Sequence, residues 1–541
     1  MKTFSKKHSI VIFLIVILAL SLQPVLPVVA SPAVPGKNID EISGQSTNPL
    51  TEPTIRYVSI LGSDTNTCTL DAPCQTLRKA LELAANGDTI KITEDIYFSE
   101  DININKGVTI SGGWDYSFDI QGGYSVVNSR SIYNNSTATI ERFAVRNNVN
   151  NYRSGVINNM SGNLTLKNCE VDNNSGSGIR NYGTLVVDQC SIHNNSTYES
   201  GGGINNSGTL TVTNSNIYSN STMSSGSGGG VGGTDGSIVI TNSYIYWNHS
   251  NWTGGGVYGK NITITNSALF ENFAQNSGGA IWSSSVVNIN NSTLANNTAG
   301  QGGGAIGVPT VSTITLNNVT VAGNHAVEGG AIKSSGGTII LKNSIVANNT
   351  AVQGDNCGPT SYAQTDGYTI IYPISCGLGG ISPDPKLGQL VPGPQNGYVP
   401  IAADSPAINA GNPATCFGTT DQRGMPRVGI CDLGSYEYIP PSQPASIQIV
   451  SGDRQRVVPG SNFDKPFTVI VLDQNNTPVG SGYDVTFTAS PSGPSGTFSA
   501  TGSNISIVKT DSSGYASSPI LRANSQIGEY TIQAYIAGGA S

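Results

Sequence analysis

A repeated segment of about 25 residues runs from Ala138 to Asn349 and constrains the fold more than any other feature. One copy, residues 209–220, reads Thr-Leu-Thr-Val-Thr-Asn-Ser-Asn-Ile-Tyr-Ser-Asn, and a loop and a Gly-rich tripeptide follow it. Nine copies succeed one another, 21 to 28 residues apart. A repeat of this length made of short strand-like runs is typical of a solenoid. We align the copies on the position of Ser215, the anchor; the anchors are Phe143, Cys169, Cys190, Ser215, Ser243, Ser267, Ser292, Val319 and Ser344.

Apolar residues recur at fixed distances from each anchor. They stand five and three residues before it, as in Leu210 and Val212, and two residues after it, as in Ile217. Alternation of this kind indicates half-buried strands. The inward residues lie an odd number of positions before the anchor, five and three, but an even number after it, two. A single strand cannot keep both sets on one face, so the chain must turn a corner between them. The residue before the anchor is Asn in seven copies, and Asn tolerates the left-handed backbone of a tight bend.

A second Asn stands five residues past every anchor. Equivalent side chains on stacked rungs are expected to form a hydrogen-bonded ladder. The glycines of the following tripeptide allow the backbone to bend sharply at a third corner of each rung. We therefore predict an all-β chain whose main part is a right-handed parallel β-helix with three strands and about 25 residues per rung. The ladder positions are Asn148, Asn174, Asn195, Asn220, Asn248, Asn272, Asn297, Asn324 and Asn349.

The N-terminal region is expected to deliver and cap this β-helix. Residues 1–30 have a basic start, an apolar run and a small-residue end, as in a signal peptide, and residues 31–54 form a polar linker. Residues 55–137 are predicted to hold the cap and the first rungs. An amphipathic helix over 76–87 is the expected cap, because the first rung of a solenoid would otherwise expose its core.

The C-terminal region is expected to contain two further parts. Residues 350–438 lose the repeat and are interpreted as a closing module, and residues 439–444 form a Pro-rich linker. Residues 445–541 show short β runs separated by Gly, Pro and Asn, which predicts an Ig-like β-sandwich. One more strand is expected after these runs, so we interpret the sandwich as truncated.

The eight cysteines fit an oxidising compartment. Three close pairs predict disulfides: Cys68–Cys74, Cys357–Cys376 and Cys416–Cys431. Cys169 and Cys190 are anchors of adjacent copies. Buried thiols are favoured there over a bridge, because parallel Cβ vectors make the bond awkward.

Composition excludes some functions. Only 11% of residues are charged and the net charge is −8, so there is no basic field to bind nucleic acid. No segment after the signal peptide is long and apolar enough to span a membrane. No residue pattern predicts a metal or another cofactor. The mature protein is expected outside the cell, secreted or on the cell surface, in an unknown oligomeric state.

Three parts of the sequence resemble known families. Gly-Gly-Ala-Ile at 278–281, 303–306 and 329–332, paired with motifs such as Ile217-x-x-Asn220, resembles the repeats of chlamydial polymorphic outer-membrane proteins. Asp404-Ser-Pro-Ala-Ile-Asn-Ala-Gly411 and Cys431-Asp-Leu-Gly-Ser-Tyr-Glu437 resemble the choice-of-anchor Q module of bacterial surface proteins. Residues 445–541, with Asp511-x-x-Gly514-Tyr515-Ala516, resemble the bacterial Ig-like domains of invasin and intimin. These resemblances imply a β-helical surface passenger associated with adhesion, displayed on an Ig-like stalk.

One outward column of the repeat is the candidate binding site. Three residues past the anchor, successive rungs present Arg146, Asp172, His193, Tyr218, Tyr246 and Phe270, followed by alanines. Tyr244 adds an aromatic on the same face, and Trp247 and Trp252 lie at its edge. Aromatic rings flanked by polar groups suit stacking on sugars. The alternative is that these rings only cover the sheet.

Catalysis is the less favoured function. Many β-helices cleave polysaccharides, but the acids of the repeats are scattered and the expected catalytic motifs are absent, so no catalytic residue is assigned. The sequence therefore predicts a non-catalytic adhesin or glycan-binding passenger whose partner is a polysaccharide or a cell-surface glycan. A polysaccharide lyase or glycoside hydrolase and a purely structural spacer remain as alternatives.

Overall fold

The computed structural model describes residues 53–94, 97–98, 100–149, 153–309, 312–378, 382–393, 397–440, 444–473 and 476–536. The predicted signal peptide and most of the predicted linker lie outside these residues. Within the described residues the chain is almost entirely β, with a single α-helix. No helix in this part is long and apolar enough to cross a membrane.

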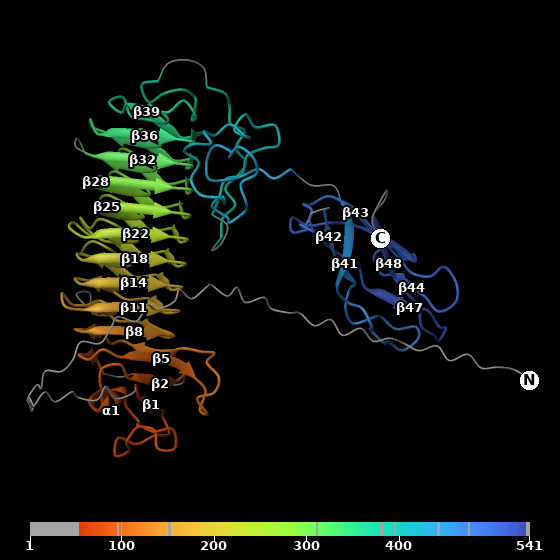
Figure 1. Cartoon of the computed structure of the whole chain (residues 1–541), viewed down its shortest axis with the longest axis horizontal. Coiled ribbons are helices and arrows are strands. Elements are labelled where there is room, and N and C mark those ends of the chain that lie inside the picture. Colours follow the sequence, from red (N-terminus) through yellow and green to blue (C-terminus); the bar gives the residue numbers. More distant parts are fainter. Residues whose placement is uncertain are drawn as a thin grey trace, which may run out of the picture. The chain divides into compact units, whose positions relative to one another are not determined.

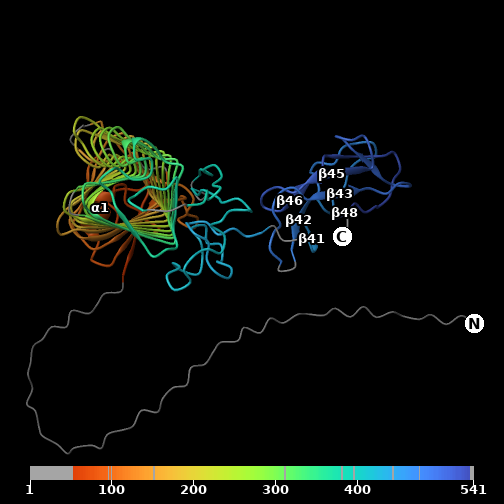
Figure 2. The ribbon, with the colours of Figure 1, turned by 90° about the horizontal axis from the view of Figure 1, so that it is seen from above.

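The repeats form a parallel β-helix of about 11 turns (Figures 1 and 2), as predicted. Equivalent positions pair in the predicted register, for example Leu185 with Leu210 and Leu210 with Ile238. These aliphatic side chains point inward and are fully buried. Burying one such side chain contributes about 1.5–3 kcal/mol, so the stacked interior is the main source of stability.

Three parallel sheets line the β-helix. The first sheet holds both the strand that follows the glycines and the strand before the anchor, which fuse into one in β25 and β28. Its strands are β1 (Ile55–Val58), β2 (Thr89–Thr93), β4 (Ile102–Ile104), β5 (Thr109–Trp114), β7 (Ile132–Asn134), β8 (Thr137–Glu141), β10 (Val156–Asn158), β11 (Asn163–Lys167), β13 (Ile179–Asn181), β14 (Thr184–Asp188), β17 (Ile204–Asn206), β18 (Thr209–Thr213), β21 (Val231–Gly232), β22 (Ser237–Thr241), β25 (Val257–Thr265), β28 (Ile281–Asn290), β31 (Ile306–Val308), β32 (Thr313–Asn317), β35 (Ile332–Ser334), β36 (Thr338–Lys342) and β39 (Ala363–Thr365).

The second sheet holds the strands just after the anchors, and the third holds short strands after the Asn ladder. The second comprises β3 (Tyr97–Phe98), β6 (Ser125–Asn128), β9 (Phe143–Arg146), β12 (Glu170–Asp172), β15 (Ser191–His193), β19 (Asn216–Tyr218), β23 (Tyr244–Tyr246), β26 (Ala268–Phe270), β29 (Thr293–Ala295), β33 (Thr320–Ala322), β37 (Ile345–Ala347) and β40 (Ile370–Tyr372). The third comprises β16 (Ser196–Thr197), β20 (Ser221–Thr222), β24 (His249–Ser250), β27 (Phe273–Ala274), β30 (Thr298–Ala299), β34 (His325–Glu328) and β38 (Thr350–Gln353). The third sheet was not predicted. The strands β38, β39 and β40 also continue the β-helix beyond Asn349, where the repeat pattern of the sequence ends.

Two corners of each rung have left-handed backbone. The residue before the anchor has a positive φ in every copy, from 45° at Asn343 to 54° at Arg142, which confirms the predicted corner. A second such corner lies four residues past each anchor and was not predicted. Its members are Asn147, Asn173, Asn194, Ser219, Trp247, Glu271, Asn296, Gly323 and Asn348.

The predicted Asn ladder is present. From Asn174 to Asn324, each side-chain amide donates to the side-chain oxygen of the next rung, as Asn272 Nδ2 does to Asn297 Oδ1 at 3.0 Å. The same amide also donates to a backbone carbonyl of the preceding rung, Ile245 for Asn272, at 2.8 Å. Each of these residues therefore ties three rungs together in the buried interior.

The anchors form a second ladder. The Ser243 hydroxyl accepts from the backbone N–H of Ser215 at 3.1 Å, and the Cys190 sulfur accepts from that of Cys169 at 3.2 Å. Cys169 and Cys190 are buried free thiols, as favoured from the sequence, and their sulfurs take the place of serine hydroxyls. The three predicted disulfides, Cys68–Cys74, Cys357–Cys376 and Cys416–Cys431, are formed.

The single helix, α1 (Leu77–Leu83), contacts the first strands of the β-helix. Thr76 caps it, accepting from the Lys79 N–H through its side chain. Leu77 and Ala80 are buried, in agreement with the predicted apolar stripe, but the helix ends four residues before Gly87. The helix ends because Ala84 has an extended backbone, and the Lys106 ammonium binds carbonyls that this early end leaves free.

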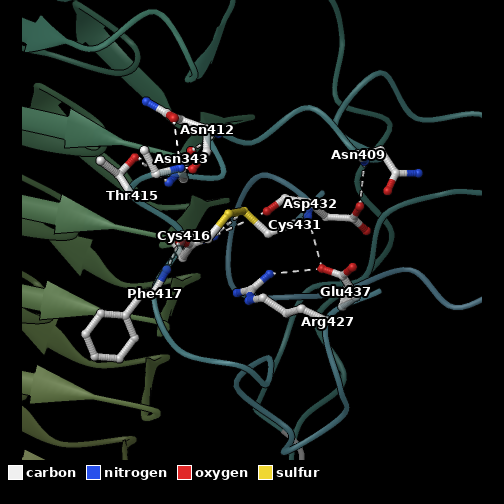
Figure 3. The surroundings of a disulfide bond; sticks show 12 residues. Asn343, Asn409, Asn412, Thr415, Cys416, Phe417, Arg427, Cys431, Asp432 and Glu437 are labelled. Carbon is white, nitrogen blue, oxygen red and sulfur yellow. Dashed lines mark hydrogen bonds and ion pairs between the residues drawn. A yellow bond between two sulfur atoms is a disulfide. The ribbon is translucent and has the colours of Figure 1, made fainter. Parts of the chain in front are cut away.

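Residues 382–393 and 397–440, which we call the docked segment, lie along the side of the β-helix, against the outer face of the second sheet (Figures 1 and 2). The closing module predicted for residues 350–438 was expected to cover the C-terminal end of the β-helix. The corner asparagines hold the segment instead: Asn343 Oδ1 accepts from Asn412 N at 2.7 Å, and Asn318 Oδ1 from Phe417 N at 2.8 Å (Figure 3). Thr293 adds buried hydrogen bonds to Gln422 and Ser435.

Residues 444–536 form antiparallel sheets, as expected of an Ig-like sandwich. Phe463, Phe487 and Phe498 belong to its own hydrophobic core. A hollow of about 1470 Å³ opens beside this core, lined in part by Phe467 and Tyr530. The strands are β41 (Ser446–Ser451), β42 (Thr468–Leu472) and β46 (Tyr515–Ser517); β43 (Asp484–Thr488), β45 (Ile505–Lys509) and β48 (Gln533–Ile536); and β44 (Gly496–Phe498) with β47 (Leu521–Ala523).

Candidate functional site

The docked segment divides the outer face of the second sheet into a covered and an uncovered part. Over the covered rungs the outward residues three past the anchor are Phe270 and then alanines, and Phe270, Ala295 and Ala322 pack in one cluster with Val399 of the segment. The remaining rungs carry large polar or aromatic side chains. We call this part the uncovered face; its residues are Arg146, Glu170, Asp172, Ser191, His193, Asn216, Tyr218, Tyr244 and Tyr246. Tyr244 and Tyr246 form its border with the docked segment, because both are partly buried against the cluster that contains Val399.

Charged side chains gather at one end of the uncovered face. The Arg146 guanidinium forms ion pairs with Glu170 and, through Nε at 3.3 Å, with Asp172 Oδ1. His193 Nε2 lies 3.1 Å from Glu170 Oε1. The predicted residues Arg146, Asp172 and His193 thus lie together. Glu170, two residues before Asp172 on the same strand, was not predicted, although its outward position is readable from the alternation.

Both ring nitrogens of His193 are within hydrogen-bond distance of neighbouring side chains. Nδ1 lies 3.1 Å from the Asn194 amide nitrogen, and Nε2 lies 3.1 Å from Glu170 Oε1. These two contacts fix the orientation of the imidazole ring.

Asp172 is the most deeply placed acid of this group, with its side chain 6% exposed. Burial raises its pKa above the ordinary value, Arg146 lowers it, and the neighbouring charge of Glu170 raises it further. One oxygen accepts a hydrogen bond from the Asn173 side chain. Asp172 is therefore a buried partner of Arg146 with little access to a ligand.

Glu170, Asp172 and His193 also have the composition of a metal site. One ligand atom of each lies within 4.8 Å of the others. Carboxylate and imidazole donors suit several divalent ions. The Arg146 guanidinium, however, is paired with both carboxylates and already supplies the positive charge. The group is accounted for without a metal, and we assign none to it.

The aromatic residues form a continuous stack along the β-helix axis. His193, Tyr218, Tyr246 and Phe270 follow one another with ring centroids 4.7, 4.9 and 4.9 Å apart and interplanar angles of 15°, 3° and 2°. Each face of Tyr218 and Tyr246 therefore lies against a neighbouring ring. The expected stacking of sugars on these faces does not fit this geometry, because only ring edges and phenol hydroxyls point outward.

Phe270 lies outside the accessible part of the stack. It is 2% exposed, since Val399 and Gly397 of the docked segment cover it. A Cβ on Gly397 would come within 2.9 Å of the Phe270 ring, so glycine is required for this close approach. Phe270 belongs to the interface with the docked segment, and we withdraw it from the predicted binding residues.

The phenols of the uncovered face are held as hydrogen-bond donors. Burial raises the pKa of Tyr246 to about 12, with a smaller effect of Tyr218, and burial also raises that of Tyr244. These phenols are protonated at neutral pH, as an unshifted tyrosine is, and burial moves their ionisation further from it. Tyr218 and Tyr246 form no side-chain hydrogen bond to any other described residue, so their hydroxyls are free to bind a ligand.

The exposed aromatic at this site is Trp247, at the corner beside Tyr246. Its indole is 57% exposed and meets the Tyr246 ring edge-on, at 5.2 Å and 71°. Its Nε1–H donates to Glu271 Oε2 at the same corner of the next rung. Trp252, also 51% exposed, lies in the loop beyond the third sheet rather than at this edge.

Comparison with known proteins gives only distant similarity. No protein-family model and no curated protein matches the chain. Several solved structures are similar to it. They include pectate lyase Pel9A (16% identity, TM-score 0.38, 72% of this chain and 97% of that chain), a rhamnogalacturonan lyase (13%, 0.32, 62% and 91%) and the GH136 lacto-N-biosidase from Eubacterium ramulus (11%, 0.24, 60% and 69%). The assignment of this chain to the parallel β-helix fold rests on its own strand register.

Proposed function

We propose that this chain is an exported bacterial surface protein that binds a polysaccharide or a cell-surface glycan on the uncovered face without cleaving it. The observation that carries the proposal is the change in one column of outward residues. They are Phe270 and alanines, without side-chain hydrogen-bonding groups, where the docked segment covers the sheet, and large hydrogen-bonding residues where the sheet is open. The open rungs therefore carry polar groups that packing against the segment does not explain.

The geometry of the uncovered face suits an extended ligand. Its rungs from Glu170 to Tyr244 span about 14 Å at the usual spacing of strands in a sheet. The Tyr218 and Tyr246 hydroxyls repeat along this line, and the charged group around Arg146 closes one end. A short stretch of a polysaccharide chain is matched to such a flat row of donors and acceptors.

Compartment and architecture are consistent with this proposal. Three disulfides are typical of proteins outside the cytosol. The segments 1–30, 31–54, 55–137, 138–349, 350–438, 439–444 and 445–541 are proposed as signal peptide, linker, cap, repeats, closing module, second linker and Ig-like stalk.

Binding by the full chain to a panel of neutral, acidic and amino-containing glycans tests the proposal. The decisive variant is Tyr218→Phe/Tyr246→Phe, which keeps the ring stack but removes two outward hydroxyls. Loss of two hydrogen bonds is expected to weaken binding about 10-fold. The matched control is Tyr258→Phe, whose ring stacks on Trp282 at 5.0 Å on a different sheet. Equal affinity of the double variant and the wild type would refute the assignment to this face.

A polysaccharide lyase or hydrolase is the alternative function. It is favoured only by the proximity of Glu170, Asp172 and His193. The pairing of both acids with Arg146 and the burial of Asp172 leave neither free to take or give a proton at a substrate. Release of reducing ends or unsaturated uronates from a polysaccharide, lost in Asp172→Asn and His193→Ala, would establish the enzyme instead.

A further inference from the structure

At one corner of the β-helix, two residues differ in type from the small or amide residues that the other rungs place there. Across nine rungs the corner four residues past the anchor has a left-handed backbone, and seven rungs place Asn, Ser or Gly there. The exceptions are Trp247 and Glu271, each with a φ of 54°. Left-handed geometry is unfavourable for bulky side chains and accumulates at functional sites. The two exceptions stand on adjacent rungs, so they form one feature.

The two side chains are joined to each other. The Trp247 indole N–H donates to the Glu271 carboxylate, and its ring meets Tyr246 edge-on. Two residues further along each rung lies a second aromatic pair, in which His249 stacks on Phe273 with centroids 4.8 Å apart. The face of an exposed indole attracts a cation, and the Glu271 carboxylate beside it supplies the opposite charge.

The negative charge at this corner comes from Glu271, which is paired with the Trp247 indole and with no described cation. The Arg146–Glu170–Asp172 group, three rungs away, carries one net negative charge at the far end of the uncovered face. The chain as a whole has a net charge of −8. An acidic glycan would be repelled here, whereas a positively charged one would be attracted.

We infer that the glycan bound by this protein carries protonated amino groups, and that Trp247 and Glu271 hold one of them at the corner. The inference rests on the proposed function of the uncovered face. The indole face contacts the charged sugar ring, the Glu271 carboxylate pairs with its ammonium group, and the Tyr246 hydroxyl extends the contact toward the uncovered face.

The test compares glucosamine oligomers with N-acetylglucosamine oligomers of the same length, at a pH where the amine is protonated, using the full chain. The amino form is expected to bind at least 10-fold more tightly. Glu271→Gln removes the charge and keeps an acceptor for the indole, so it should abolish this preference while leaving affinity for the acetylated form unchanged. Equal binding of both oligomers, or an unchanged preference in Glu271→Gln, overturns the inference.

A second variant removes the ambiguity of misfolding. Trp247→Asn restores the residue that other rungs place at this corner, so it should fold with an equal or higher Tm and yet bind the amino oligomer at least 10-fold more weakly. Trp252→Ala, which removes an exposed indole elsewhere, is the control and should bind as the wild type does. Unchanged binding in Trp247→Asn overturns the inference.

The experiments separate the inference from the function beneath it. Suppose that Tyr218→Phe/Tyr246→Phe weakens binding of the acetylated oligomer but Glu271→Gln leaves the preference for the amino oligomer unchanged. Glycan binding by the uncovered face is then supported, and the ammonium site at Trp247 and Glu271 is refuted. If no glycan binds, both fall. A lysine-rich peptide serves as a further arm: binding as tight as that of the amino oligomer would assign the ammonium to a protein partner and overturn the glycan assignment.

Discussion

At the scale of the residue, side chains at the corners of the rungs form the hydrogen bonds that backbone groups would form within a sheet. The ladder asparagine is the clearest case: Asn272 donates to Ile245 O, Phe270 O and Asn297 Oδ1 and accepts from Asn248. It is buried, so no water can substitute for these bonds. One amide thus satisfies groups on three rungs.

Asn272→Ala should therefore destabilise the β-helix strongly. Several buried donors and acceptors lose their partner at once, and each costs about 1–3 kcal/mol, so we expect a loss of about 3–5 kcal/mol. A fall in Tm measured by circular dichroism checks this. Asn261→Ala, an exposed position on β25, is the control and should change stability by less than about 0.5 kcal/mol. Similar Tm values for the two variants would contradict the role of the ladder.

Sequence reasoning worked best at this scale. The corner before the anchor and the Asn ladder follow from the intrinsic preferences of Asn and from a fixed count of residues, and both are present. The ring stack of Tyr218 and Tyr246 was misjudged, although the spacing of rungs is itself close to a stacking distance. The spacing of the rungs therefore already implied that neighbouring rings would cover the faces of Tyr218 and Tyr246.

At the scale of the element, the docked segment depends on a buried network (Figure 3). Arg427 pairs with Glu437 at 3.0 Å, with side chains 5% and 1% exposed. Asp432 accepts from the backbone N–H groups of Asn409 at 2.7 Å and Tyr438 at 2.6 Å. Burial nevertheless raises the pKa of Asp432 to about 6, and the charge of Glu437 adds to the effect.

This raised pKa predicts a pH dependence of stability. Between about pH 4 and 6 the folded segment keeps a proton that the unfolded chain releases, so the contribution of Asp432 to stability falls as pH rises through this window, by up to about 3 kcal/mol. Calorimetry at pH 4 and 7 should show that Asp432→Asn gains stability relative to wild type on going to pH 7. Asp404→Asn, at an exposed acid of the same segment, is the control. The same pH profile in Asp432→Asn and wild type would contradict the raised pKa.

The disulfide Cys416–Cys431 should matter locally. It closes a loop with a sequence separation of 15 residues, which corresponds to about 3 kcal/mol of stabilisation. In Cys416→Ser/Cys431→Ser we expect faster proteolysis within residues 405–438 while the rungs stay protected. Simultaneous loss of protection in the rungs would mean that the segment and the β-helix unfold as one unit.

Sequence reasoning reached its limit at the docked segment. Its contacts join residues far apart in the chain, such as Thr293 with Gln422 and Asn343 with Asn412. No periodicity reports such pairs, so the lateral position of the segment and the burial of Phe270 were not predicted. The third sheet was missed for a different reason, because strands as short as Ser196–Thr197 show no alternation.

At the scale of the whole molecule, the chain has separate cores. The core of the β-helix runs from Val58 to Cys376, whereas Phe487 and Phe498 belong to the core of residues 444–536, and the two cores share no residue. Cooperative unfolding of a core requires contacts within it. The antiparallel sheets are therefore expected to melt independently of the rungs.

Phe487→Ala tests this independence. Removing a fully buried phenylalanine costs about 3–5 kcal/mol. In calorimetry of the full chain, only the transition of the antiparallel sheets should move to lower temperature, with the transition of the rungs unchanged. A shift of both transitions would show that the two cores unfold together.

The Asn ladder also gives the molecule a direction. Every amide from Asn174 to Asn324 donates toward the C-terminal neighbour, and the series ends where Asn349 donates to Asn356 and Asn356 to the carbonyl of Pro373. The C-terminal surface of each finished rung thus presents donors to the rung that arrives next. A chain emerging N-terminus first can therefore add rungs to this growth front one at a time.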